Sequence, residues 1–152
     1  MKNVFLSVMG IFLTVSLTAH AHAEMIEEKE VPPEVISAFE RTYPNAEVVG
    51  CSREMRGESL VFEIESRECG TRRDIIYSPD GFALEVEESI APGALPAAVR
   101  RSLSVKYPEG RIAAAERFIT GHQRFYDVNM VQNDEKLEVR LDEKGNIVKV
   151  TP

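Results

Sequence analysis

Polar and apolar positions alternate along this chain in a pattern that occurs twice. After Val31-Pro32, apolar residues recur at every fourth position, at Val35, Phe39 and Tyr43. This spacing places them along one side of a helix. The proline after Tyr43 ends that helix, because proline disfavours helical backbone in the residue before it and cannot donate the next hydrogen bond. The pattern therefore predicts a helix between Pro32 and Tyr43.

The residues after this helix change to a period of two. Leu60, Phe62 and Ile64 alternate with polar or outward-facing positions, which is typical of a half-buried strand. A strand over Glu47–Met55 precedes this one, and two more follow around Ile75 and Val86. The segment "SPDGF" between the last two contains a glycine where a tight hairpin needs positive φ. One unit thus reads helix followed by four strands.

The second copy lies 64 residues later, because Val31–Val86 aligns with Leu95–Val150 without a gap. Identical residues fall at the helix start, at the Tyr-Pro stop and in the turns. We predict an α+β fold of two tandem α-β-β-β-β repeats, each a helix packed on an antiparallel sheet. The repeats span residues 31–88 and 95–152, joined by residues 89–94. Units of about 60 residues are marginal alone, so we expect a shared core or a continuous sheet.

The N-terminus has the features of a secretory signal peptide. Lys2 precedes an apolar run, and Ala21-His22-Ala23 forms a small-x-small cleavage site. We expect cleavage after Ala23. The apolar run is shorter than the roughly 20 residues of a membrane-spanning helix, which disfavours an uncleaved anchor. Residues 24–30 form a charged leader that we expect to be frayed.

Charge narrows the classes of partner. The net charge is −7 at pH 7, and it becomes −8 when Lys2 leaves with the signal peptide. An acidic protein of this kind is a poor ligand for nucleic acid or for an anionic membrane surface. We expect a periplasmic or secreted protein that does not insert in the membrane after cleavage and that has a protein partner.

Catalytic and cofactor chemistry finds little support. After the leader the chain contains one histidine, His122, in a predicted turn, and no nucleophile-base pair is apparent. Acidic runs are more typical of solvated strands than of a glycosidase acid pair. The turn "DEKGN" lacks the ligand spacing of a calcium loop. We expect no enzyme activity, no cofactor and no metal site.

Two cysteines, Cys51 and Cys69, lie in the first repeat, and the second repeat has none. An oxidising compartment favours a disulfide between them over two buried thiols. The hairpin register opposes this pairing, since Cys69 lies beyond the residues that face Cys51. A bulge or a curled strand end would be needed to bring the two Cα atoms close enough. We nevertheless expect the disulfide on the grounds of compartment.

Strand periodicity also indicates a candidate partner-binding surface. It places a mixed set of apolar and charged residues on the sheet face opposite the predicted core: Val61, Ile76, Phe125, Asp127 and Arg140. Aromatic residues and arginine are enriched at protein interfaces, whereas single exposed apolar residues are common and mean little. The hairpin tips supply a second candidate set: Arg56, Glu58 and His122.

The motifs together resemble the PepSY-like family related to the secreted beta-lactamase inhibitor proteins. The shared marks are the Val-Pro or Leu-Pro helix start, the Tyr-Pro stop, the strand "VFEIE" and the Asp-x-Gly hairpin, in both copies. The resemblance implies tandem α+β repeats, an exported protein, and binding or inhibition without catalysis. It identifies no inhibitory residue, since the contact loops contain no matching motif.

The leading hypothesis is an exported, non-catalytic protein-binding module, with inhibition or regulation of an envelope or secreted enzyme as one form. The alternative is a structural or envelope-stress protein that acts by self-association or strand addition. A small hydrolase is the third hypothesis, and the lack of a catalytic constellation disfavours it.

Overall fold

The computed structural model describes residues 23–152, so the expected signal peptide lies outside the described residues except for Ala23. These described residues form two α-helices, nine strands and two short 3-10 helices. In chain order they are β1 (Glu24–Ile26), η1 (Glu28–Glu30), α1 (Pro33–Thr42), β2 (Glu47–Arg56), β3 (Ser59–Glu68), β4 (Thr71–Tyr77), β5 (Ala83–Ile90), η2 (Pro92–Ala94), α2 (Ala97–Lys106), β6 (Arg111–Thr120), β7 (Gln123–Gln132), β8 (Glu135–Asp142) and β9 (Ile147–Thr151).

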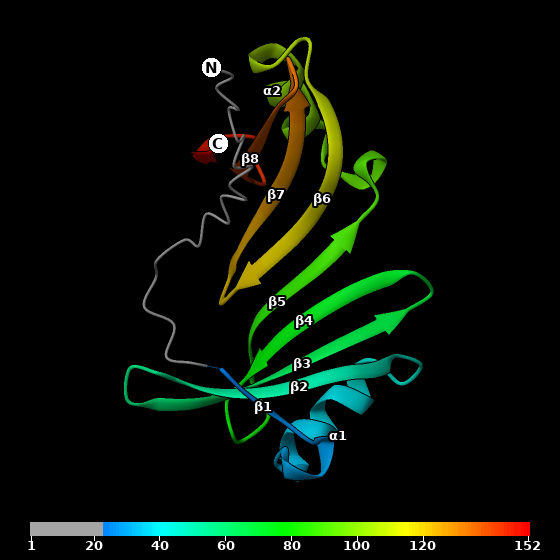
Figure 1. The fold of residues 1–152 in the computed structure, drawn as a ribbon, viewed down its shortest axis with the longest axis vertical. Helices are drawn as coiled ribbons and strands as arrows, with labels where there is room; N and C mark the ends of the chain where they lie inside the picture. Colours follow the sequence, from blue (N-terminus) through cyan, green and yellow to red (C-terminus); the bar gives the residue numbers. More distant parts are fainter. Residues whose placement is uncertain (1–22) are drawn as a thin grey trace, which may run out of the picture.

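All nine strands belong to one antiparallel sheet, in which each strand pairs with its neighbours in the sequence. β5 closes the first half and pairs with β6, which opens the second half. The sheet is therefore continuous across the two halves, as the small size of each unit requires. Figure 1 shows α1 and α2 at opposite ends of this sheet.

The helix stops lie where the sequence predicts them. α1 ends at Thr42, and the backbone N–H of Tyr43 donates to the carbonyl of Phe39 at 2.8 Å. α2 ends at Lys106, and Tyr107 donates to Leu103 at the same distance. Both tyrosines leave the helical region with φ of −130°, because proline follows each. The Tyr-Pro stop is confirmed in both halves.

The 64-residue offset also holds in the irregularities of the sheet. β2 has a break in register between Val48 and Gly50, and β6 has one between Ile112 and Ala114. The pairing of β4 with β5 shifts after Ile76, and the pairing of β8 with β9 shifts after Arg140. Bulges at equivalent positions give the two halves the same local bends.

The charged leader is not frayed as expected. Residues 24–26 form β1, which pairs with β2 so that Ile26 lies opposite Cys51 and Glu24 lies opposite Arg53. The guanidinium of Arg53 donates to the Glu24 carboxylate at 2.8 Å. β1 therefore supplies hydrogen-bond partners for part of the β2 edge. A three-residue strand is sufficient for this, although its sequence shows no alternation.

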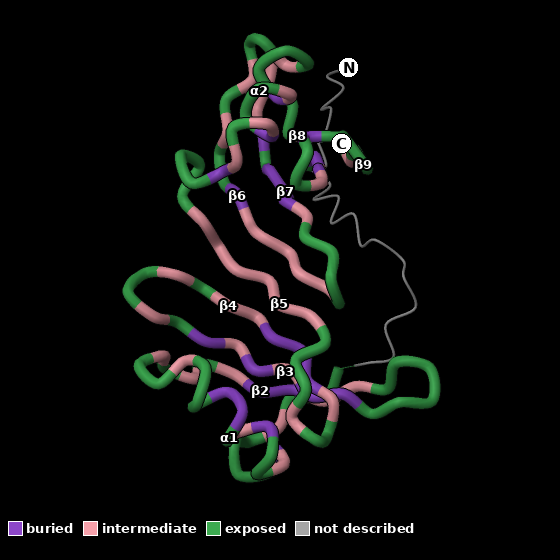
Figure 2. The backbone as a smooth tube through the Cα atoms, turned by 180° about the vertical axis from the view of Figure 1, so that it is seen from behind, coloured by how far each residue is buried: buried purple, intermediate pink, exposed green. Residues whose placement is uncertain are grey.

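The buried residues form two separate cores. The first joins α1 to β2–β4, and the second joins α2 to β6–β8. Figure 2 shows the buried positions gathered toward each helix, with mostly half-buried residues along β5 and β6 between them. Both cores lie on one face of the sheet, because Val86 packs against the first core and Ile90 against the second, and these side chains point to the same side of β5. We call this the helix face.

Candidate binding surface

The other side of the sheet, which we call the open face, is the candidate site. Cross-strand partners point to the same side of a sheet, so the register determines which residues share this face. Glu65, Asp74 and Glu87 form one row, which continues through Phe118 and Phe125 on β6 and β7. A second row contains Glu116, Asp127 and Arg140. Within residues 23–152, neither helix contributes to this side.

The register brings the five candidate residues to this one face. Val61 and Ile76 lie on β3 and β4, and Phe125, Asp127 and Arg140 lie on β7 and β8. Tyr126, which neighbours Phe125, belongs to the second core on the helix face. Period-two alternation was therefore sufficient to separate the two faces.

Val61 and Ile76 are not exposed as expected. Val61 is 2% exposed and Ile76 is 7% exposed. The guanidinium of Arg56 reaches the Glu85 carboxylate at 2.6 Å, although β2 and β5 would stand about 14 Å apart in a flat sheet. The sheet therefore curls toward the open face at this end. Val61 and Ile76 are part of the packing beneath that curl, so they offer little surface to a partner.

The less buried part of the open face lies on β6–β8, although Asp127 there is not exposed as expected, with 6% of its surface accessible. Arg140 donates two hydrogen bonds to the Asp127 carboxylate, at 2.7 and 2.6 Å. The same guanidinium lies over the ring of Phe118, 4.9 Å from its centroid. Phe118 faces Phe125 across the strand pair, and both rings are half-buried. Two aromatic rings and an oriented arginine form a compact patch of the residue types that anchor interfaces.

Phe118 is a component that the sequence analysis missed. Its strand reads "RIAAAERFIT", where Glu116, Phe118 and Thr120 share one side and Arg117 and Ile119 share the other. Apolar residues occur on both sides, so periodicity alone does not choose the buried one. The pairing with Phe125 would have identified it, because the register follows from the turn at Gly121.

Carboxylates surround this patch. Burial and a hydrogen bond to Glu116 raise the pKa of Glu87 to about 7, and the charges of Glu116, Asp74 and Asp127 add to the effect. Burial also raises the pKa of Glu63, which accepts a hydrogen bond from the Ser52 hydroxyl at 3.0 Å. The open face thus holds acidic groups close together. Their mutual repulsion and burial disfavour the ionised carboxylates, and a cationic partner would reduce this electrostatic cost.

The hairpin-tip candidates separate into different environments. Arg56 pairs with Glu54 as well as Glu85, so it stabilises the curl of the sheet. Glu58 and His122 are exposed, at the turns of Gly57 and Gly121. Both glycines have positive φ and adopt the backbone that these turns need. His122 is next to Gln123 at the start of β7, three residues before Phe125 on the open face.

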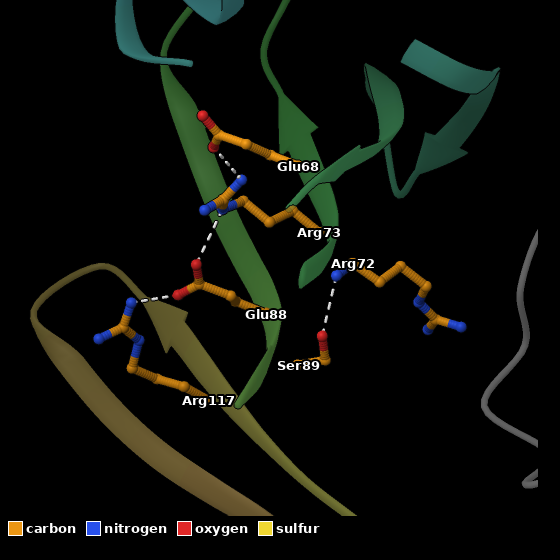
Figure 3. A network of polar contacts seen from close by, with 6 residues as sticks. All are labelled: Glu68, Arg72, Arg73, Glu88, Ser89 and Arg117. Carbon is orange, nitrogen blue, oxygen red and sulfur yellow. Dashed lines mark hydrogen bonds and ion pairs between the residues drawn. The ribbon is translucent and has the colours of Figure 1, made fainter. Parts of the chain in front are cut away.

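The helix face contains a polar network between the two cores (Figure 3). Glu88 on β5 pairs with Arg73 on β4 at 2.8 Å and with Arg117 on β6. Arg73 also pairs with Glu68 at 2.9 Å, and its guanidinium lies 4.8 Å from the ring centroid of Tyr43. The network links the two halves of the sheet across the junction of β5 and β6.

The expected disulfide is not formed, since Cys51 and Cys69 are both free. Cys51 is buried opposite Ile64, and Cys69 is exposed in the turn after β3. Cys69 follows Ile64 by five residues, or about 16 Å along a strand, whereas a disulfide needs Cα atoms within about 7 Å. The bulge in β2 lies between Val48 and Gly50 and does not close this gap.

The described part of the chain shows no helix long and apolar enough to cross a membrane. In the same residues, no three His, Cys, Asp or Glu side chains gather as ligands for a metal ion. The features that the geometry does assemble are the aromatic and arginine patch and its acidic border.

Comparison with known proteins agrees with this description. The family model described as "Putative beta-lactamase-inhibitor-like, PepSY-like" matches twice, over residues 17–84 and 68–149. The chain belongs to this PepSY-like family. The two matches together span most of the sequence and overlap over residues 68–84. The comparison with curated proteins found no match.

Solved structures share the fold. A "putative periplasmic" protein from Bacteroides eggerthii aligns with a TM-score of 0.65 and 15% identity, covering 80% of this chain and 88% of that one. A DUF2874 family protein from Bacteroides uniformis gives 0.63 and 16%, with 79% and 88% covered. A BLIP-like protein from Bacteroides fragilis gives 0.60 and 16%, with 78% and 83% covered. At such identities the likeness establishes the architecture alone.

Proposed function

We propose that this protein is an exported, non-catalytic binding module whose open face contacts a protein partner. The observation that carries the proposal is the patch of Phe118, Phe125 and Arg140, which lies on the sheet face that neither α1 nor α2 covers. We further propose that each repeat is a unit of one helix packed on its own strands. Two such units side by side present one continuous surface.

The chemistry of the open face favours a basic partner surface. Carboxylates outnumber cations around the patch, and Glu87 and Glu116 are close enough to raise the pKa of Glu87. A lysine or arginine from a partner would relieve this repulsion, so association should weaken with added salt. Inhibition or regulation of an envelope or secreted enzyme is the form that the BLIP-like likeness suggests.

Export is part of the same proposal. Two observations support a periplasmic or secreted location. They are the signal peptide with its Ala21-His22-Ala23 site and the description of a structural neighbour as putative periplasmic. The mature chain would then begin at Glu24, whose side chain pairs with Arg53. The intact mass of the exported protein tests this, because a mass that retains residues 1–23 would mean an anchored protein.

The binding proposal is tested by affinity capture from a periplasmic extract with three baits. These are the unaltered protein, Phe125→Ala on the open face, and Val105→Ala on α2, where the side chain is 78% exposed. We expect one stoichiometric partner that the unaltered protein and Val105→Ala retain and Phe125→Ala loses. Equal capture by all three baits would place the contact elsewhere, and turnover of a substrate by the pure protein would favour an enzyme.

A further inference from the structure

The open stretches of strand edge in the described residues 23–152 include β9 and one end of β2. β9 pairs with β8 on one side only, and β2 pairs with β1 only over Cys51–Arg53, which leaves Glu54–Arg56 without a neighbour on that side. Apolar side chains are exposed at both places: Val150 is 46% exposed and Met55 is 46% exposed. Open edges of this kind are where another strand can add.

The internal strand β5 shows what such an edge can pair with. Its residues 88–90 pair with β6 in the same register in which residues 24–26, which form β1, pair with β2, 64 positions earlier. Glu88 lies opposite Arg117 as Glu24 lies opposite Arg53, and an ion pair joins both sets. Each of these positions differs by 64 residues from its equivalent. β1 is therefore the equivalent of the second half of β5.

The first half of β5 has its equivalent at the opposite end of the sheet. Residues 83–87 correspond to 147–151, which is β9, and both strands contain the same shift in register against their preceding strand. β5 is thus a complete strand, while β1 and β9 are its two halves, separated by the width of the sheet. A β9 strand placed end to end with β1 of a second copy would rebuild this strand, with Pro152 turned out of the sheet because Glu24 already lies opposite Arg53.

The pairing of β5 with β6 fixes the register of that contact. Val86 lies opposite Ile119 and Glu87 lies opposite Phe118. In the contact between copies, each β5 residue is replaced by the β9 residue 64 positions later, and each β6 residue by the β2 residue 64 positions earlier. Val150 of one copy then lies opposite Met55 of the next, and Thr151 lies opposite Glu54. Val150 and Met55 both fall on the helix face, so they would form an apolar pair like Val86 and Ile119.

We propose that copies of this protein associate head to tail, with β9 of one copy extending the β2 edge of the next, end to end with β1. The bulge in β9 and the charge of Lys149 are features that often protect an edge, yet β5 has the equivalent bulge and is paired on both sides. Because the two contacting surfaces differ, the association is heterologous, and repetition of the contact gives an open chain or a closed ring. This proposal does not depend on partner binding by the open face.

Cysteine cross-linking between two variants tests the register. Met55→Cys and Val150→Cys are placed in separate copies of the exported protein, each in a background with Cys51→Ala and Cys69→Ser. The copies are mixed at high concentration, in salt that screens the net charge of −8 of the exported protein, and are then oxidised. We expect a disulfide-linked dimer in the mixture, at a yield at least fivefold above that of either variant alone.

The control replaces Val150→Cys with Val148→Cys, which lies in the bulge and has no cross-strand partner in β8. Both valines are exposed, so both variants should fold as the unaltered protein does. Equal yields with Val148→Cys would overturn the register. Dimers from Val150→Cys alone would mean that two β9 strands pair with each other, and no dimer above the control would overturn the association itself.

Discussion

Glu88 joins the two halves of the sheet by accepting hydrogen bonds from Arg73 on β4 and Arg117 on β6. The side chain of Glu88 is 13% exposed and that of Arg73 is 12% exposed, so solvent screens this pair little, whereas Arg117 is 39% exposed. In the equivalent pair at the edge of the sheet, Arg53 is exposed to a similar extent as Arg117, but Glu24 is 63% exposed. The same interaction thus occurs twice, once at a half-buried joint and once at an open edge.

The first prediction uses this equivalence. Glu88→Gln should reduce the free energy of unfolding by about 2–3 kcal/mol, because it leaves two guanidinium groups short of a partner in a half-buried site. Glu24→Gln should change it by less than about 1 kcal/mol, since exposed pairs contribute little. Urea unfolding of both variants provides the measurement. Equal effects would mean that the joint between the halves does not depend on Glu88.

The second prediction tests the two faces of β7. Tyr126→Ala should reduce the stability by about 3–5 kcal/mol, because its ring is 6% exposed and its removal leaves a cavity in the second core. Phe125→Ala, on the half-buried side, should have a clearly smaller effect. Thermal unfolding of the two variants measures the difference. If Phe125→Ala were the more damaging change, the open face would be the true core.

The third prediction concerns the hairpin before β9. Gly145 has φ of +85°, and a Cβ there would lie 2.6 Å from the Ala98 carbonyl oxygen on α2. Gly145→Ala should therefore cost more than about 2 kcal/mol, from backbone strain together with displacement of the helix. Gly121→Ala is the matched control, with φ of +56° and open space around its Cβ. Similar losses of stability in the two variants would mean that backbone strain at positive φ explains the effect and that the contact with α2 adds nothing.

The fourth prediction follows from the pKa of Glu87, which burial and Glu116 raise to about 7 from an unfolded value near 4.3. Between these values the folded protein keeps a proton that the unfolded chain loses. The contribution of Glu87 to stability is therefore complete below about pH 4 and is lost as the pH rises through 7.

Glu87→Gln should remove that dependence. Between pH 5.5 and pH 8 the unaltered protein should lose about 1 kcal/mol more stability than the variant, after allowing for screening by solvent. Urea unfolding at the two pH values measures this. A parallel decline in both proteins would assign the pH dependence to other groups.

The fold could be predicted from sequence where a local rule was sufficient. The Tyr-Pro stops, the hairpin at Gly81 and the side on which Phe125 and Tyr126 lie all follow from chain chemistry within a few residues. β1 could not be predicted this way, because three residues beginning at Glu24 carry no alternation. They form a strand only because the β2 edge is available.

The site was less predictable because it depends on contacts between distant strands. Val61 was expected on the surface, and it is buried because Arg56 and Glu85 hold a curl that periodicity does not encode. The Glu87 and Glu116 contact arises only when β5 pairs with β6. The expected disulfide was wrong because compartment gives no information on the register that separates Cys51 from Cys69.

The central claim is that the open face binds a protein partner, and the most direct measurement is the dissociation constant of the captured partner for Phe125→Ala and for Val105→Ala. Loss of an interface anchor should weaken binding by Phe125→Ala about tenfold or more, whereas Val105→Ala should bind as the unaltered protein does. Unchanged affinity of Phe125→Ala, with its fold intact, would contradict the account.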